Sequence, residues 1–343
     1  MRRALTIVVL LALMGAFAFG VNRFFALRKA HVAEASTPTV SKPAFVLPGT
    51  IYVAQQGVMY KLNRGTFTAL RLPKNGTWMQ PAIVPGTNDI VAVMRTAAYS
   101  EVFQIDGVAG TVINQLSHNA TTSSTIQLNH WMFWPRLSAD GQTLYVSYDS
   151  PKSIQSYEIE FAVWAGPLSG KIASKQWTDP FSYTGGDVAP VPLPGGALLY
   201  SKYEISGGNV YSRLAIDTRA RADPVYLTND TDDCGQPAVS PDGTQLAMVC
   251  TGGTGLQSTR LEVAPLTGTT LGTPRTLVDN CLCSSPQWSP DGRSLVYYAP
   301  ADATGHFQLW WIDGAAGLTP KPPKQVTQNL DLDATSPPAW SPA

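Results

Sequence analysis

The stretch Pro237-Ala-Val-Ser-Pro-Asp-Gly243 recurs along the chain and decides the fold. A second full copy is Pro286-Gln-Trp-Ser-Pro-Asp-Gly292, and Pro135-Arg-Leu-Ser-Ala-Asp-Gly141 is a close variant. Weaker copies begin at Pro81 and Pro190, and a last, shortened copy is Pro338-Ala-Trp-Ser-Pro342. The leading prolines are 54, 55, 47, 49 and 52 residues apart. A repeat period near fifty residues is typical of solenoid or propeller arrays.

Each copy predicts a strand, a tight turn and a second strand. Proline fixes φ at the second turn position, Asp caps the turn, and Gly takes the position that needs a positive φ. Strand-like residues follow, such as Leu246-Ala-Met-Val249, and a third strand comes after a variable loop, such as Leu261-Glu-Val-Ala264. Four strands in about fifty residues describe a propeller blade. We therefore predict an all-β fold, a six-bladed β-propeller with four antiparallel strands per blade.

The two ends of the repeat region complement each other. The copy that starts at Pro338 has no second strand after it, and residues 50–72 hold three strand-like segments without a first strand. One strand from the C-terminus and three from the N-terminus would complete a sixth blade and close the ring. We predict that the strand near residues 337–341 pairs beside residues 50–54, within a propeller that covers residues 49–343.

The first 48 residues are expected to form a targeting segment and a linker. Arg2 and Arg3 precede an uncharged, mostly apolar run, residues 4–21, which just reaches the length of a membrane span. Ala33-Glu-Ala35 resembles a cleavage site, so residues 1–35 are predicted to be either a membrane-anchor helix or a cleaved signal peptide. Residues 36–48 form the linker. Both alternatives predict an exported propeller, periplasmic or otherwise extracytoplasmic, that is membrane-anchored or, after cleavage, secreted.

The charge distribution argues against a nucleic-acid partner. The formal net charge is zero, with 24 basic and 24 acidic residues. The first 35 residues carry five of the basic residues and one acidic residue, so the remainder holds 19 basic against 23 acidic residues. Because binding to phosphate backbones needs a basic face, a propeller with a net negative charge is unsuited to it.

All four cysteines lie within fifty residues of one another, and an even number in an exported chain suggests disulfides. A hairpin through Pro241-Asp242-Gly243 would bring Cys234 and Cys250 nearly opposite, so this pair is the favoured bond. A second bond between Cys281 and Cys283 would close a very small ring, so pairing between blades stays open. A Cys-x-Cys metal site is the functional alternative, but no histidine lies nearby in the sequence.

Phrases of the form Pro-x-Trp-Ser-Pro-Asp-Gly resemble the repeats of TolB-like six-bladed β-propellers. They also resemble the propeller domains of tricorn-type and prolyl-oligopeptidase-type proteases. The resemblance covers about residues 50–343 and implies a fold rather than a chemistry, because the motif forms the turn of the blade. TolB itself is periplasmic but has an extra α/β domain before its propeller. Since the predicted span and linker leave no room for that domain, a role in the Tol–Pal envelope system is not implied.

If the first strands run innermost, the residues before each anchor proline line one mouth of the central channel. These segments offer carboxylates, amides and aromatic rings, which suit a peptide, a sugar or a cation. The same side chains could instead be ordinary loop caps or packing between blades. The candidate partner-binding residues are His130, Trp131, Trp134, Asp187, Asp233, Asp279 and Asp333.

Catalytic signals are scarce in the sequence. There is no Gly-x-Ser-x-Gly elbow, and no hydrolase domain follows the propeller, so the protease resemblance lacks its catalytic half. Only His130 falls on the presumed rim, which disfavours the histidine-held metal of the oligogalacturonate lyases that also use such propellers. We therefore predict no cofactor or metal and a non-catalytic cell-envelope propeller that binds a protein or peptide at its channel mouth. The alternative is a glycan lyase, a glycan hydrolase or a peptidase-like enzyme acting at the same mouth.

Overall fold

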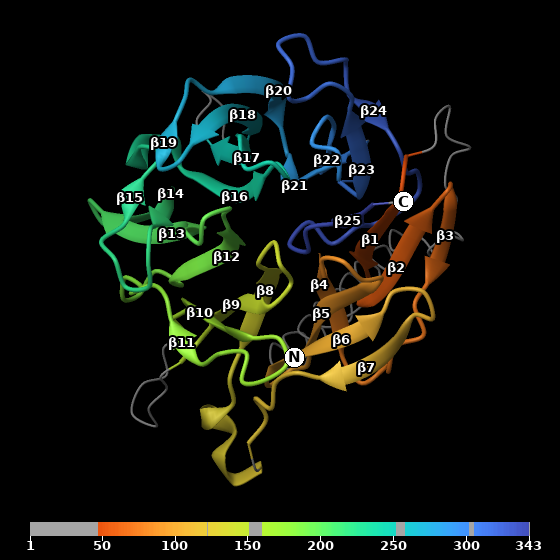
Figure 1. The fold of residues 1–343 in the computed structure, drawn as a ribbon, viewed down its shortest axis with the longest axis vertical. Helices are drawn as coiled ribbons and strands as arrows, with labels where there is room; N and C mark the ends of the chain where they lie inside the picture. The colour runs from red at the N-terminus through yellow and green to blue at the C-terminus, as the bar shows by residue number, and fades with distance from the viewer. Residues whose placement is uncertain (1–46, 122, 151–159, 252–257, 302–304, 343) are drawn as a thin grey trace, which may run out of the picture. The chain divides into compact units, whose positions relative to one another are not determined.

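The computed structural model describes residues 47–342, except for residues 122, 151–159, 252–257 and 302–304. Within this part, the chain forms six blades arranged in a ring (Figure 1). The predicted anchor or signal segment, residues 1–35, lies outside the described residues, as does the linker up to residue 46. In the part that is described, no helix has the length and apolar character needed to cross a membrane.

The first three blades follow one another along the chain. Blade 1 contains β4 (Thr77–Ile83), β5 (Asp89–Arg95), β6 (Ser100–Asp106) and β7 (Thr111–Gln115). Blade 2 contains β8 (Met132–Leu137), β9 (Thr143–Tyr148), β10 (Ala162–Pro167) and β11 (Lys175–Gln176), preceded by the short 3₁₀ segment η1 (Ser123–Leu128). Blade 3 contains β12 (Asp187–Pro192), β13 (Leu198–Ser206), β14 (Asn209–Asp217) and β15 (Val225–Tyr226).

The remaining blades complete the ring. Blade 4 follows the 3₁₀ turn η2 (Asp230–Asp232) and contains β16 (Cys234–Val239), β17 (Gln245–Thr251), β18 (Thr259–Thr267), β19 (Thr270–Leu271) and β20 (Arg275–Cys281). Blade 5 contains β21 (Ser284–Trp288), β22 (Leu295–Pro300), β23 (Phe307–Ile312) and β24 (Lys324–Gln325). Blade 6 contains β25 (Ala339–Ser341), β1 (Thr50–Gln55), β2 (Val58–Asn63) and β3 (Thr66–Ala69).

Five blades have four antiparallel strands, as predicted, and blade 4 has five. After its third strand, β18, the chain turns back at Gly268, where φ is +58°. The two-residue strand β19 follows and pairs with the end of β18. The chain then returns along β18 as β20, which takes the place of the expected fourth strand. The four-strand prediction is therefore wrong by one short strand in this blade.

The recurring Ser-Pro-Asp-Gly turn joins the first and second strands by the predicted contacts. In blade 4, the Asp242 carboxylate accepts a hydrogen bond from Ser240 Oγ at 2.5 Å and one from the Thr244 N–H at 3.1 Å. These bonds lower the pKa of Asp242, the Ser240 hydroxyl most of all. Gly243 has φ of +76° and donates its N–H to Ser240 O at 2.8 Å. Glycine adopts such a φ without steric cost, so the turn residues act as predicted.

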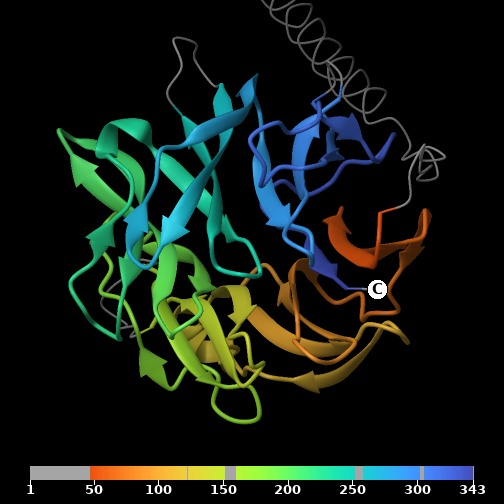
Figure 2. The same cartoon turned by 45° about the horizontal axis from the view of Figure 1, so that its top comes forward.

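The ring is closed in blade 6 by strands from both ends of the chain. β25 pairs antiparallel with β1, with Ile51 opposite Trp340 and Tyr52 opposite Ala339. Trp340 is buried, and its indole N–H donates to Pro48 O at 2.7 Å. In Figures 1 and 2, β25 in blue lies beside β1 in red-orange. The predicted closure by a shared blade is confirmed.

Apolar side chains fill every interface between neighbouring blades. One cluster of buried residues spans blades 6, 1 and 2, and four further clusters span the remaining four interfaces around the ring. Trp288 occupies the same repeat position as Trp340, and its indole N–H donates to Ala238 O of the preceding blade at 3.0 Å. Each blade is therefore held by its neighbours, since one face of a sheet is buried only when the next blade covers it.

Two disulfides lie in and beside blade 4. Cys234 and Cys250 are opposite each other in the β16–β17 pairing, with Cα atoms 4.0 Å apart, and form the favoured bond. Cys281 and Cys283 form the second bond, which follows β20. The structure thus contains the short-range second pair and not the pairing between blades that the sequence left open.

Ring closure can be tested at Trp340. Trp340→Ala should lower the free energy of unfolding by about 3–5 kcal/mol, because it opens a cavity in the closing blade. Trp340→Phe keeps an aromatic ring but loses the hydrogen bond to Pro48 O. Its loss in free energy of unfolding should be smaller than that of Trp340→Ala and should include about 1 kcal/mol for the lost hydrogen bond. Urea unfolding followed by far-UV circular dichroism measures both. A Trp340→Ala variant as stable as the wild type would contradict closure through β25.

Candidate functional site

The inner strands of all six blades form the wall of a central channel. Each inner strand contributes the residue that follows its anchor proline to the lining. These channel-facing residues are Ala82, Arg136, Val191, Ala238, Gln287 and Ala339. They line a cavity of about 210 Å³, and a second cavity of about 210 Å³ continues from it toward the mouth. Arg136, Val191 and Pro237 line both, so the two cavities are parts of one channel.

A β-bulge marks the mouth end of the inner strand in blades 1 to 5. The residue before the anchor proline has a left-handed conformation there, with φ between +50° and +53°: Gln80, Trp134, Ala189, Gln236 and Ser285. The pairing register with the second strand shifts at the same point. Proline has no N–H, so it fits a bulge without leaving a donor unpaired. A left-handed non-glycine residue costs about 1–2 kcal/mol, so other interactions must hold these bulges.

Hydrogen bonds between neighbouring bulges supply those interactions. Gln80 Oε1 accepts from the Trp134 N–H at 2.7 Å, and the Gln80 N–H donates to Ser336 Oγ at 2.6 Å. Across the ring, Gln236 Oε1 accepts from the Ser285 N–H at 2.6 Å, and Ser285 Oγ donates to a backbone carbonyl before β25 at 2.8 Å. We call this set the bulge belt. It joins blades 6, 1 and 2 on one side and blades 4, 5 and 6 on the other.

The bulge belt is interrupted between blades 2 and 3. The indole of Trp134 can only donate a hydrogen bond, and Ala189 has no polar side chain, so neither can accept from a neighbouring backbone. Blades 3 and 4 are linked differently, by the Gln236 N–H that donates to Ser201 Oγ at 3.2 Å. The mouth cavity is lined at the interruption by Trp134, Val188, Ala189, Ser201 and Tyr203, which we call the open sector.

Arg136 is the one charged side chain among the described residues that line the two channel cavities. Its Nη1 donates to Pro135 O at 3.1 Å and to Pro81 O at 3.4 Å. Burial in the channel wall lowers the pKa of Arg136 to about 10, so the guanidinium stays charged at neutral pH. Arg136 is not among the predicted site residues, although the repeat holds the signal: the residue after the anchor proline lines the channel in every blade.

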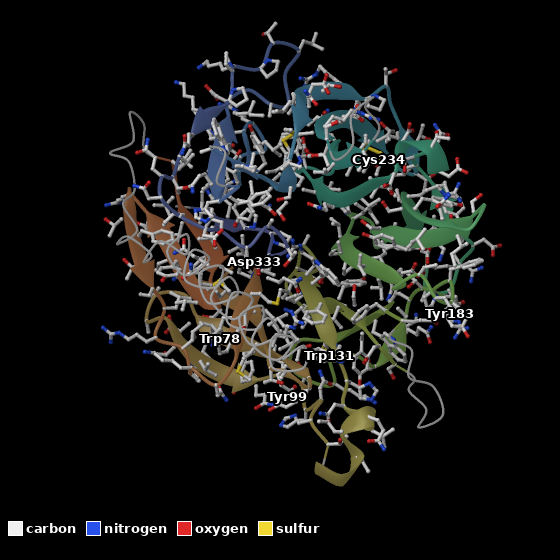
Figure 3. All side chains as sticks on the ribbon, turned by 180° about the vertical axis from the view of Figure 1, so that it is seen from behind. Trp78, Tyr99, Trp131, Tyr183, Cys234 and Asp333 are labelled. Atoms are coloured by element: carbon white, nitrogen blue, oxygen red, sulfur yellow. A yellow bond between two sulfur atoms is a disulfide. The ribbon has the colours of Figure 1, made fainter. Side chains whose placement is uncertain are left out.

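Aromatic side chains gather on the mouth face beside the open sector. Phe133 stacks on Trp131 with ring centroids 6.1 Å apart, and it meets Trp134 and Phe161 edge-on at 5.7 Å each. These four rings, the mouth aromatic cluster, are all partly exposed. The Arg95 guanidinium lies 5.8 Å from the centre of the Trp131 ring. Figure 3 shows Trp131 between the centrally placed Asp333 and the edge of the ring. Trp131 and Trp134 were predicted, whereas Phe133 and Phe161 were not.

His130 lies next to the mouth aromatic cluster and pairs with a carboxylate that sequence analysis missed. His130 Nδ1 is 2.9 Å from Asp149 Oδ1, which also accepts from the Trp131 N–H at 2.9 Å. The Asp149 side chain is enclosed, while the imidazole keeps some exposure. A histidine oriented by a buried carboxylate is suited to proton transfer. Among the residues that the structure describes, no hydroxyl or thiol is hydrogen-bonded to this imidazole.

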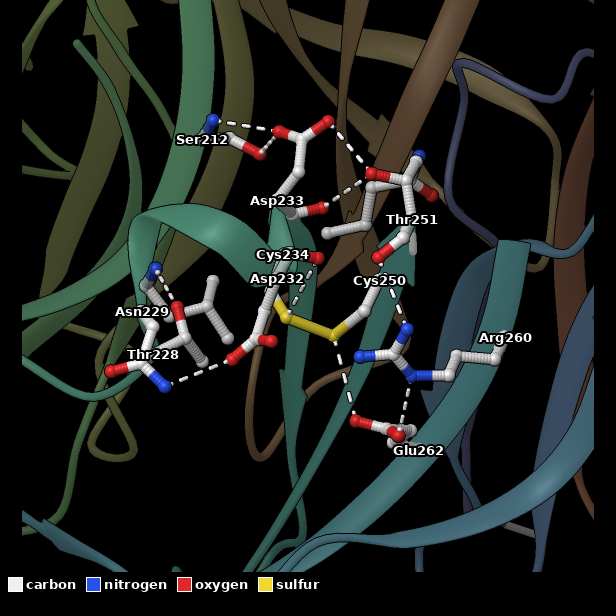
Figure 4. The surroundings of a disulfide bond; sticks show 12 residues. Ser212, Thr228, Asn229, Asp232, Asp233, Cys234, Cys250, Thr251, Arg260 and Glu262 are labelled. Carbon is white, nitrogen blue, oxygen red and sulfur yellow. Dashed lines mark hydrogen bonds and ion pairs between the residues drawn. A yellow bond between two sulfur atoms is a disulfide. The ribbon is translucent and has the colours of Figure 1, made fainter. Parts of the chain in front are cut away.

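Asp233 and Asp333 lie at the mouth face and act as caps of loops. Asp233 Oδ1 accepts from the Ser212 N–H at 2.8 Å, and its Oδ2 accepts from Thr251 Oγ1 at 2.8 Å, beside the Cys234–Cys250 disulfide (Figure 4). Asp333 Oδ1 accepts from the Thr335 N–H at 2.9 Å. The alternative in which these carboxylates cap loops thus describes their observed contacts.

Two further candidates do not line the two channel cavities. Asp279 is exposed on β20, the outer strand that replaced the expected fourth strand of blade 4. Asp187 is fully buried on β12 and forms an ion pair with Lys202 Nζ at 3.2 Å. Desolvation raises the pKa of Asp187 to about 7, and the Lys202 charge opposes that shift. Asp279 is thus on the outer edge of its blade and the Asp187 side chain is enclosed, and a role of either carboxylate in partner binding stays a prediction.

Another cavity lies between blades 1 and 2, outside the channel. It measures about 970 Å³ and is lined by residues of β7, the segment after it and the β10–β11 connection. None of the predicted site residues lines it. In the described part of the chain, no group of three or more His, Cys, Asp or Glu residues is arranged to hold a metal ion.

The fold resembles those of solved β-propeller structures. No protein-family model matches the chain, and no curated protein matches its sequence. Among solved structures, TolB from Acinetobacter baumannii has a TM-score of 0.63 and 17% identity, covering 86% of this chain and 67% of that chain. A chain of a nidogen/laminin complex has a TM-score of 0.57 and 12% identity, covering 84% of this chain and 97% of that one. A putative TolB from Agrobacterium tumefaciens has a TM-score of 0.53 and 13% identity, with coverage of 86% and 99%. At these identities the likeness shows a TolB-like six-bladed propeller fold.

The buried Asp187 should make stability depend on pH. Its pKa is about 7 in the folded chain and about 3.9 when unfolded, so its protonated form favours folding, fully so below pH 4. That contribution is lost as the pH rises through 7, with a slope of at most about 1.4 kcal/mol per pH unit.

Asp187→Asn should therefore flatten the fall in free energy of unfolding between about pH 4 and 7, measured by urea titration at each pH. Asp217, whose pKa desolvation raises to about 6, acts in the same direction at lower pH and remains in the variant. Asp279→Asn removes an exposed carboxylate and serves as the matched control, with the wild-type slope. An unchanged slope in Asp187→Asn would show that Asp187 does not titrate in this range.

Proposed function

We propose that this chain is an exported, non-catalytic propeller that captures a protein or peptide partner at its channel mouth. The observation that carries the proposal is the mouth aromatic cluster, four partly exposed rings next to the sector between blades 2 and 3 where the bulge belt is interrupted. Aromatic side chains carry a large share of binding energy in protein interfaces. The open sector gives such a partner access to the channel wall.

The proposed cell-envelope location rests on separate observations. Two disulfides join all four cysteines, and disulfides persist in oxidising compartments outside the cytosol. The basic and then apolar residues 1–21 have the composition of a signal peptide or a membrane anchor. We propose export by this segment, with the propeller on the extracytoplasmic side and a partner in the same compartment.

A second candidate function, an enzyme at the channel mouth, is favoured by the His130–Asp149 pair. A partly exposed imidazole against an enclosed carboxylate could move a proton during cleavage of a glycan or peptide. Partner capture and cleavage predict different outcomes for the same protein, so one set of variants separates them.

The tryptophans of the mouth aromatic cluster provide the main test. The full chain is immobilised, exposed to solubilised envelope extract, and its captured proteins are quantified by mass spectrometry. The double variant Trp131→Ala/Trp134→Ala should lose at least tenfold in capture of its main partner, since each hot-spot ring contributes about 2 kcal/mol or more. Urea unfolding verifies that the variant is folded.

The matched control removes a different aromatic pair. Tyr60 and Phe67 stack at 4.5 Å on the outer strands of blade 6, so Tyr60→Ala/Phe67→Ala deletes a stacked aromatic pair away from the mouth. This control should capture like the wild type. Equal capture by the two double variants would refute binding at the mouth. Turnover of an envelope glycan or peptide that is lost in His130→Ala would establish the enzyme in place of the binding propeller.

A further inference from the structure

The Arg136 guanidinium has no counter-charge in the wall of the channel. Its hydrogen bonds go to two neutral carbonyl oxygens, those of Pro81 and Pro135, and both are made by Nη1. Among the described residues, no carboxylate forms an ion pair with it, and its Nε and Nη2 donate to none of them. A charge held partly out of water without a partner is costly, so this group favours an anion that can enter the channel.

The surroundings of Arg136 select the kind of anion. The channel wall around it consists mainly of prolines and small apolar residues, with no second cation among the described lining residues. One guanidinium balances one negative charge, and its planar fork matches the two oxygens of a carboxylate. A phosphate group, with nearly two charges at neutral pH, would keep an uncompensated charge in the same place. The site therefore fits a carboxylate better than a phosphate.

The open sector leads to this guanidinium from the mouth. Arg136 lines both channel cavities, including the mouth cavity bounded by Trp134, Ala189 and Tyr203. Small side chains at Ala189 and Ser201 leave room there, and the Trp134 ring belongs to the mouth aromatic cluster. A peptide lying on the cluster would thus have the channel cation within reach of its end or of an extended acidic side chain.

We propose that Arg136 is the receptor for a carboxylate of the partner, inserted into the central channel through the open sector. This inference rests on the proposed function, because it assigns the partner's chemistry at the same site. The carboxylate can be a chain terminus or the side chain of an aspartate or glutamate. A free small carboxylic acid offers the same group without a peptide, and the experiment separates these sources.

The test observes the arginine directly in the full chain. Arginine labelled with ¹⁵N gives side-chain Nε–Hε signals, and Arg136→Gln assigns that of Arg136 by its disappearance. The probes are acetate, N-acetyl-Ala-Ala with a free carboxylate, and N-acetyl-Ala-Glu-Ala-amide. Acetamide and N-acetyl-Ala-Ala-amide are the neutral matches. We expect the carboxylate probes to shift the Arg136 signal saturably and the neutral matches to leave it unmoved.

Affinities then identify the source of the carboxylate. Either acidic peptide should bind at least tenfold more tightly than acetate, because it also contacts the mouth aromatic cluster. Calorimetry should show at least a tenfold loss of peptide affinity in Arg136→Gln. The control Arg71→Gln, at an exposed arginine outside the channel, should retain wild-type affinity. Acetate binding as tightly as both peptides would overturn the peptide source, and no shift with any carboxylate would overturn the site itself.

Partner capture from envelope extract keeps the two proposals separable. Capture that depends on Trp131 and Trp134 but is unchanged in Arg136→Gln would retain the binding propeller and overturn the role of Arg136. A carboxylate-dependent shift at Arg136, combined with equal capture by the tryptophan variant and its control, would retain the anion site and overturn the proposed function.

Discussion

The pairing of β25 with β1 is the constraint on which the rest of the structure depends. Three residues from the C-terminal end complete a sheet that begins near residue 50, and the Trp340 indole ties that sheet to Pro48. Only a closed ring gives each blade two neighbours to cover its apolar faces, and the buried clusters run through all six interfaces. The channel, the bulge belt and the mouth exist because the inner strands are held in that circle.

Within the ring, a repeated backbone feature produces one asymmetric site. In blades 1 to 5 a bulge precedes the anchor proline, and a glutamine or serine at that position ties neighbouring blades together. Trp134 and Ala189 occupy equivalent positions and cannot make the same bond, so the bulge belt is interrupted between blades 2 and 3. The same inner strand carries Arg136 into the channel two residues after Trp134. The partly exposed rings of the mouth aromatic cluster and the Arg136 guanidinium are therefore carried by the same inner strand and its surroundings.

The repeat predicted the architecture well, because a turn motif and strand periodicity are local properties. The Cys234–Cys250 bond followed from the same hairpin register. The site was less predictable, since its contacts join distant segments. Asp187 is buried in an ion pair with Lys202 of the next strand. Asp279 lies on a blade edge because the chain turns at Gly268 and forms β19 before it returns along β18. The bulge belt needs left-handed residues before proline, where extended backbone is the usual expectation. Arg136 was visible in the repeat pattern, but only once the channel-facing position was known.

Site-directed photocrosslinking tests whether the partner is bound at the open sector of the channel mouth. Tyr203, which lines that sector, is replaced by p-benzoylphenylalanine in the full chain, and intact cells are irradiated. A second variant carries the same residue at Tyr226, a tyrosine on the outer strand β15 of the same blade. Binding at the open sector should give a partner adduct from position 203 and none from position 226. An adduct of that partner from position 226 alone would place binding on the outer blade edge and contradict the account.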